Sequence, residues 1–283
     1  MKLKLFSILA VVAAISSACT SLNSGDSFNQ TIDGVEYNFE VIVSKMNFVR
    51  LSPVSSPALL TGKIVLPAST QYEGVKYVVT QIGERAFKNY AGITAVTLPS
   101  TLSQIEKEAF AGCTALQEIN VPQPLSVIGD YAFDGCKSLK AFSLKASISE
   151  LGIGAFRGCE SIKELEFTPT FSAIPDELCL GCTSLKAINL PSTIMSIGES
   201  AFEDCLSVAT ISIDSSLQTI GANAFAGCTS VESIVCMTPT PPTCPANTFT
   251  GINTLIPVTV PMANVKQYYA AEGWNRFANI IGK

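Results

Sequence analysis

Residues 105–127 read IEKEAFAGCTALQEINVPQPLSV, and this pattern recurs along most of the chain. Its opening Ile-x-x-x-Ala-Phe segment starts at residues 82, 105, 128, 151, 174, 197 and 220, so that successive starts are 23 residues apart without an insertion. An eighth unit starts at Cys244, and the one additional residue before it falls in the proline-rich stretch 238–243. A fixed period of this length is typical of a solenoid in which each unit forms one coil.

The apolar positions inside the unit predict the shape of a coil. Leu116, Ile119 and Val121 alternate with polar residues as in a short strand. The Phe110 to Cys113 segment has closer spacing, which favours a short helical or 3₁₀ turn. We therefore expect a right-handed coil whose strands stack into a parallel sheet at about 4.8 Å per coil, so that eight coils span roughly 35 Å.

Stacking of identical units predicts columns of like side chains inside the solenoid. The expected aromatic column is Phe87, Phe110, Phe133, Phe156, Phe202, Phe225 and Phe249. The expected aliphatic column is Leu98, Val121, Leu144, Phe167, Leu190 and Ile213. One unit cannot bury its own apolar side, whereas a stack of units can, which is why the repeats predict one continuous core.

The consensus I-G-x-x-A-F-x-G-C-x-x-L-x-x-I-x-L-P resembles the BspA-like leucine-rich repeats of bacterial surface proteins. The resemblance covers residues 59–283 and implies a leucine-rich-repeat solenoid. It also implies adhesion to proteins of a host or of neighbouring cells. It does not indicate which ligand is bound.

A solenoid needs a cover at each open end. We expect residues 28–81 to form a β-rich N-terminal cap with an irregular first coil, because Asp33-Gly34 is a hairpin signal and about nine residues are inserted around Tyr72 to Tyr77. Residues 82–266 are the eight repeats. We expect residues 267–283 to form a helical C-terminal cap, with helix over 263–272 and Tyr268, Trp274, Phe277 and Ile280 as its plug.

The first 19 residues, MKLKLFSILAVVAAISSAC, indicate export. Two lysines precede an apolar run that is too short for a stable membrane span, and small residues follow it. Residues 1–18 are the predicted signal peptide. Cys19 then resembles the lipidated first residue of a bacterial lipoprotein, with residues 19–27 as a tether. This leader predicts lipid anchoring in the outer membrane or at the cell surface, with no other membrane contact.

The composition excludes several functions. The chain contains no histidine, which removes serine–histidine and cysteine–histidine nucleophile pairs and all histidine metal sites. A net charge of −5 with 14% charged residues does not favour nucleic-acid binding. Phosphate-binding loops are also lacking, and we expect no cofactor, no metal and no enzymatic activity. Glu164 and Glu166 share one strand face and could act as an acid–base pair, but we favour their interpretation as part of a solvated strand face.

The ten cysteines are interpreted by their register. Six of them occupy one position of successive units: Cys113, Cys136, Cys159, Cys182, Cys205 and Cys228. We expect a column of small, buried, free thiols, because their side chains point in parallel. Cys179 takes the phenylalanine position and lacks further ligands for zinc. Cys236 and Cys244 flank the proline-rich stretch, and a disulfide between them is left open.

The outward strand positions form the candidate ligand-binding face. They are Lys140, Lys163, Lys186, Glu118, Glu164, Glu166, Asn120 and Asn189. A broad face on a rigid solenoid suits an extended partner. Together with the leader and with what the resemblance implies, it leads us to expect a surface-exposed, monomeric cell-envelope lipoprotein that binds a protein or extracellular-matrix ligand. The alternatives are a periplasm-facing scaffold without an external ligand and, third, a hydrolase.

Overall fold

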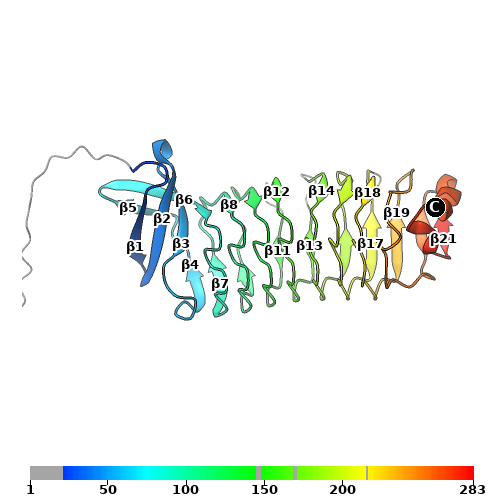
Figure 1. Cartoon of the computed structure of the whole chain (residues 1–283), viewed down its shortest axis with the longest axis horizontal. Coiled ribbons are helices and arrows are strands. Elements are labelled where there is room, and N and C mark those ends of the chain that lie inside the picture. Colours follow the sequence, from blue (N-terminus) through cyan, green and yellow to red (C-terminus); the bar gives the residue numbers. More distant parts are fainter. Residues whose placement is uncertain (1–21, 145–147, 168–170, 215) are drawn as a thin grey trace, which may run out of the picture.

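The chain folds into an elongated stack of coils with a different cap at each end (Figure 1). The computed structural model describes residues 22–144, 148–167, 171–214 and 216–283. The predicted signal peptide, Cys19 and the next two residues of the tether lie outside these residues. None of the helices in the described part of the chain is long and apolar enough to cross a membrane.

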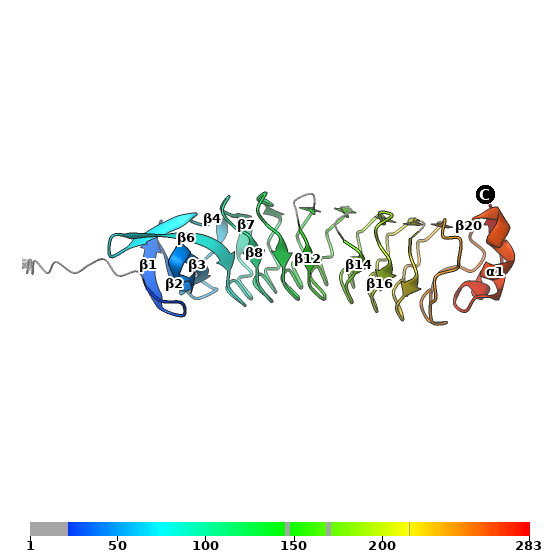
Figure 2. The same ribbon diagram turned by 90° about the horizontal axis from the view of Figure 1, so that it is seen from above.

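Each coil contributes two short strands, which form two separate sheet faces along the stack (Figures 1 and 2). Strands of the first sheet face are β6 (Val75–Ile82), β8 (Gln104–Ile105), β10 (Val127–Ile128), β12 (Glu150–Leu151), β14 (Ala173–Ile174), β16 (Ser196–Ile197) and β18 (Thr219–Ile220). Strands of the second sheet face are β4 (Gly62–Val65), β7 (Ile93–Thr97), β9 (Glu118–Ile119), β11 (Phe142–Ser143), β13 (Leu165–Glu166), β15 (Ala187–Asn189), β17 (Thr210–Ile213), β19 (Ser233–Cys236), β20 (Val258–Val260) and β21 (Ile280–Gly282).

Pairing within both faces is parallel and follows the repeat. Ile128 lies opposite Ile105 on one side and Leu151 on the other, and Phe142 lies opposite Leu165. The predicted solenoid of stacked parallel strands is therefore confirmed. The alternation that predicts a strand marks only the second sheet face. The first-face strands β8, β10, β12, β14, β16 and β18 are each two residues long and show no period of their own.

The expected helical or 3₁₀ turns are corrected by the structure. Ala109 and Ala111 donate backbone hydrogen bonds to the carbonyl three residues earlier, at 3.2 and 3.1 Å. Phe110 and Gly112, however, donate to the next coil at 2.8 and 2.7 Å. Positive φ angles of 54° at Glu108 and 75° at Gly112 interrupt any helix. The segment is a run of β-turns because alternate N–H groups join the coils together.

The aromatic column is confirmed as the centre of the core. The rings of Phe87, Phe110, Phe133 and Phe156 stack with centroids 5.1, 5.4 and 5.6 Å apart. A second stack joins Phe202, Phe225 and Phe249 at 5.7 and 5.6 Å. The two stacks are separated at Cys179. The ring of Phe167 makes an edge contact with Phe202 at 6.3 Å and so spans the level of the missing ring.

The cysteine column is buried and its thiols are free. The Cys113 thiol donates to the Phe87 carbonyl at 3.0 Å, and the Cys136 thiol donates to the Phe110 carbonyl at 3.2 Å, one coil away. Burial raises the pKa of Cys113 to about 12. Cys236 and Cys244, for which a disulfide was open, are also free. The thiols therefore act as small core groups that link successive coils.

The N-terminal cap is β-rich, as predicted. β1 (Ser27–Ile32) and β2 (Val35–Val43) form an antiparallel hairpin at Asp33-Gly34, whose φ angles of 50° and 80° suit a tight hairpin turn. A short 3₁₀ turn η1 (Ser44–Met46) leads to β3 (Phe48–Pro53), which pairs with β6 and so joins the cap to the first coil. The inserted residues around Tyr72 form a second hairpin, between β5 (Ser69–Tyr72) and β6.

The C-terminal cap contains η2 (Met262–Asn264), α1 (Val265–Ala270), η3 (Trp274–Arg276) and β21. Helix α1 lies within the expected helix, although the cap elements begin at Met262, before the expected boundary at 267. All four predicted plug residues are buried. Phe249, the last ring of the column, contacts Trp274 at 5.0 Å and Phe277 at 5.4 Å. The cap therefore continues the aromatic core and covers its open end.

Candidate functional site

All eight residues of the predicted ligand face are exposed and lie on or beside strands of the second sheet face. Glu118 and Asn120 belong to the β9 coil, Lys140 to the β11 coil, and the remaining five to the β13 and β15 coils. Lysines at one repeat position form a column across three coils, as the repeat predicts.

Five of these residues surround one cleft. Lys163, Glu164, Glu166, Lys186 and Asn189 line a cavity of about 210 Å³, with Leu165 and Ala187 beside them. The cleft lies between β13 and β15, which belong to different sheets and are not paired. One main-chain bond, from Lys186 N–H to the Lys163 carbonyl at 3.0 Å, joins the two coils next to it. The sequence therefore identifies the residues, and the structure adds the break in the sheet that brings them around a cavity.

The other three predicted residues do not line this cleft. The side-chain amide of Asn120 accepts a hydrogen bond from the Leu98 N–H at 2.6 Å and donates one to the Leu98 carbonyl at 3.0 Å. The Asn120 amide thus completes the hydrogen bonding of the preceding coil, and its role in ligand binding stays a prediction. Lys140 donates to the Gln117 side chain at 3.0 Å, and Glu118 lies two coils from the cleft.

The same two coils are also separated on the first sheet face. Between most coils, the residue after the repeat isoleucine donates its N–H to the preceding coil, as Gly129 does to Ile105 and Gly198 does to Ile174, both at 2.8 Å. Pro175 takes this position and has no N–H to donate. β12 and β14 do not pair here, and a cleft of about 420 Å³ opens between them. Sequence reasoning missed this cleft, although a proline at a repeat glycine position was its signal.

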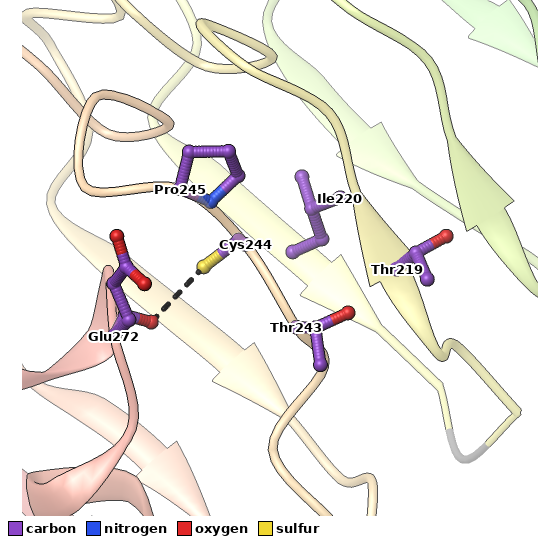
Figure 3. A pocket seen from close by; sticks show the side chains of 6 residues that line it. All are labelled: Thr219, Ile220, Thr243, Cys244, Pro245 and Glu272. Atoms are coloured by element: carbon purple, nitrogen blue, oxygen red, sulfur yellow. Dashed lines mark hydrogen bonds between the residues drawn. The ribbon is translucent and has the colours of Figure 1, made fainter.

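A second proline, Pro245, occupies the same position of the last unit and accompanies a similar cleft (Figure 3). This cleft has a volume of about 380 Å³. Thr219 and Ile220 lie on one side, Thr243 and Cys244 follow in the next coil, and Glu272 lies on the cap side (Figure 3). The Cys244 thiol donates to the main-chain carbonyl of Glu272 at 3.4 Å, which ties the cap to the cleft.

The described residues offer little for covalent or metal chemistry. They contain no group of three or more cysteine, aspartate or glutamate side chains that could hold a metal ion. Cys179 and Cys182 are fully buried, and the pKa of Cys179 is raised by the hydrogen bond that its thiol makes to Cys182 and by burial. A thiol with a raised pKa stays protonated and is a poor nucleophile.

Comparison with known proteins agrees with this geometry. The family model for the BspA type leucine rich repeat region matches residues 80–205 and 174–271 in six copies. A leucine-rich repeat protein from Bacteroides ovatus is similar in structure, with a TM-score of 0.58 and 22% identity over 90% of this chain and 77% of its own. A leucine rich cell surface protein from Faecalibacterium prausnitzii also has a TM-score of 0.58, at 17% identity over 92% of this chain and 96% of its own. No curated protein matches the chain.

Proposed function

The chain belongs to the BspA-type leucine-rich repeat family, whose fold is a protein-interaction scaffold, and we propose that it is a cell-envelope lipoprotein that binds a protein ligand through the second sheet face. The observation that carries the proposal is the cleft between β13 and β15. Two lysines and two glutamates surround its apolar floor, which suits a protein surface that carries both charges.

The position of the cleft supports a macromolecular ligand. It lies in the middle of the stack, far from both caps, and exposed strand residues extend from it in both directions (Figure 1). A cavity of about 210 Å³ is smaller than a typical small-molecule pocket of roughly 300–1,000 Å³. A partner that lies across several coils could place one or two side chains in it and gain area from the surrounding face.

Charge reversal tests the binding face. The chain over residues 20–283 is assayed against immobilised envelope and extracellular-matrix proteins, in the native form and as K140E/K163E/K186E. We expect the variant to lose most of its binding to any protein that the native chain captures, because Lys163 and Lys186 line the cleft. The matched control is K76E/K107E/K266E, which reverses three exposed lysines elsewhere and has the same net charge. Equal binding by the two variants would remove the second sheet face from consideration.

The proposed location at the outer surface needs a separate test. The predicted leader, with Cys19 as its lipidated residue, is the basis for it. Intact cells that produce the full chain are treated with a protease, and the amount of intact protein is compared with that in lysed cells. Cleavage in intact cells supports display at the surface. Protection in intact cells with cleavage after lysis would favour the periplasm-facing scaffold.

A further inference from the structure

The two clefts on the first sheet face share one feature, a proline that removes an inter-coil N–H donor. Pro175 and Pro245 both follow the repeat isoleucine position, where Gly152, Gly198 and Gly221 each donate an N–H to the preceding coil at 2.8 Å. Without that donor, the carbonyls of Leu151 and Ile220 receive no inter-coil hydrogen bond from any described residue. Each carbonyl is left as an acceptor at the edge of a cleft of 420 or 380 Å³.

The two clefts also present the same chemistry. The first is lined by the hydroxyls of Ser149 and Ser172 and the carboxylate of Glu150. The second is lined by the hydroxyls of Thr219 and Thr243 and the carboxylate of Glu272.

Both glutamates are exposed, and among the described residues no lysine or arginine lines either cleft. Leu151, Phe171 and Pro175 form an apolar wall in the first cleft, and Ile220 and Pro245 form one in the second (Figure 3).

This combination fits an arginine side chain. A guanidinium has five N–H donors in a planar fork and no acceptor, so it can satisfy a carboxylate, a hydroxyl and a carbonyl together. Its apolar stem can pack along leucine, isoleucine or proline. The net charge of −5 further favours a basic partner. A lysine has three donors from one point and would reach fewer of these acceptors.

The distance between the two clefts defines how far apart the two arginines of a bound segment must be. Pro175 and Pro245 are three repeat units apart, which corresponds to about 14 Å along the stack at 4.8 Å per coil. In an extended peptide, residues four apart point to the same side and are also about 14 Å apart, at 3.4 Å per residue. Met195, which is 46% exposed, lies on this face between the clefts and offers an apolar contact for the peptide between its two arginines.

We propose that the first sheet face binds an extended, basic protein segment through two arginines at positions i and i+4, one in each proline-opened cleft. This site is separate from the second sheet face and does not depend on the function proposed above. Its specificity comes from the register between peptide and coils, whereas a general attraction of basic peptides to an acidic protein would not depend on the spacing.

The probe is a labelled seven-residue threonine peptide with arginines at its second and sixth positions, titrated by fluorescence anisotropy at low salt. A peptide with arginines at the second and fifth positions is the spacing control. We expect the control peptide to bind about tenfold more weakly, because one of its arginines faces away from the sheet. Equal affinity for the two peptides would overturn the proposal.

Variants of the protein test the clefts themselves. E150Q/E272Q should bind the first peptide about tenfold more weakly, because two ion pairs are lost. P175G/P245G, which restores the N–H donors, should also weaken binding. The matched control E36Q/E232Q removes two exposed carboxylates that line neither cleft and should leave binding unchanged. An equal loss in this control, or no loss in E150Q/E272Q when its circular dichroism is native, would refute the site.

Discussion

The aromatic column offers a quantitative test of how the coils hold together. Phe133 and Phe156 are both fully buried, and both make a tilted contact with Phe142, at 5.1 and 4.9 Å. They differ in their stacked neighbours. Phe133 lies between Phe110 and Phe156, whereas Phe156 has a stacked ring only on one side, because the next coil supplies Cys179. Replacement of either residue by leucine therefore removes the same buried ring but a different number of stacking contacts.

The structure sets the expected size of the difference. F133L and F156L both lose the free energy of burying the ring away from water and both lose the contact with Phe142. These two contributions are similar in the two variants and largely cancel when the variants are compared. Each stacked pair contributes about 1 kcal/mol beyond its buried area. We therefore expect F133L to lower the free energy of unfolding by about 1 kcal/mol more than F156L does.

Urea denaturation of residues 20–283 measures this difference. Circular dichroism reports the whole stack, and fluorescence of the single tryptophan, Trp274, reports the C-terminal cap. Agreement between the two transitions would justify one free energy for the whole chain. If F156L proves as costly as F133L, stacking between coils is not what the column contributes. The column would then stabilise the fold only through the burial of its apolar rings.

Two further predictions concern individual hydrogen bonds and charges. N120A should lower the free energy of unfolding by about 1 kcal/mol, because both hydrogen bonds to Leu98 are lost. Urea denaturation measures this change, with N189A as the control. An equal loss of stability in both variants would contradict the role of Asn120. Glu108 has its pKa lowered to about 2 by hydrogen bonds from Arg85 and Lys88. The ionised Glu108 carboxylate should stabilise the fold fully above pH 5, and this effect should be lost as the pH falls through 2. The melting temperature of the native protein should therefore fall more than that of E108Q over this range. Parallel curves of melting temperature against pH for the two proteins would refute this role of Glu108.

The sequence predicted most of the fold because the repeat determines it. A fixed period places Phe110 above Phe87 and Cys136 above Cys113, and the core follows directly. Strand breaks were harder to predict. The gap beside Pro175 lies where one N–H is missing from a repeated pattern, and the role of Asn120 depends on an amide that reaches the neighbouring coil. A pattern search reports what recurs, whereas these features come from residues that depart from the pattern.

The departures from the repeat fall close together, and their positions are informative. Pro175, Cys179 and Phe167 all lie at the junction between the β12–β13 coil and the β14–β15 coil, where pairing stops on both sheet faces. Consensus residues bind each coil to its neighbours, so their main-chain groups are already satisfied and cannot bind a ligand. Substitution by proline makes an acceptor available, and the unpaired strands leave room for a side chain. In a solenoid of this kind, a ligand is therefore best sought where the repeat is broken, and here the break coincides with clefts on both faces.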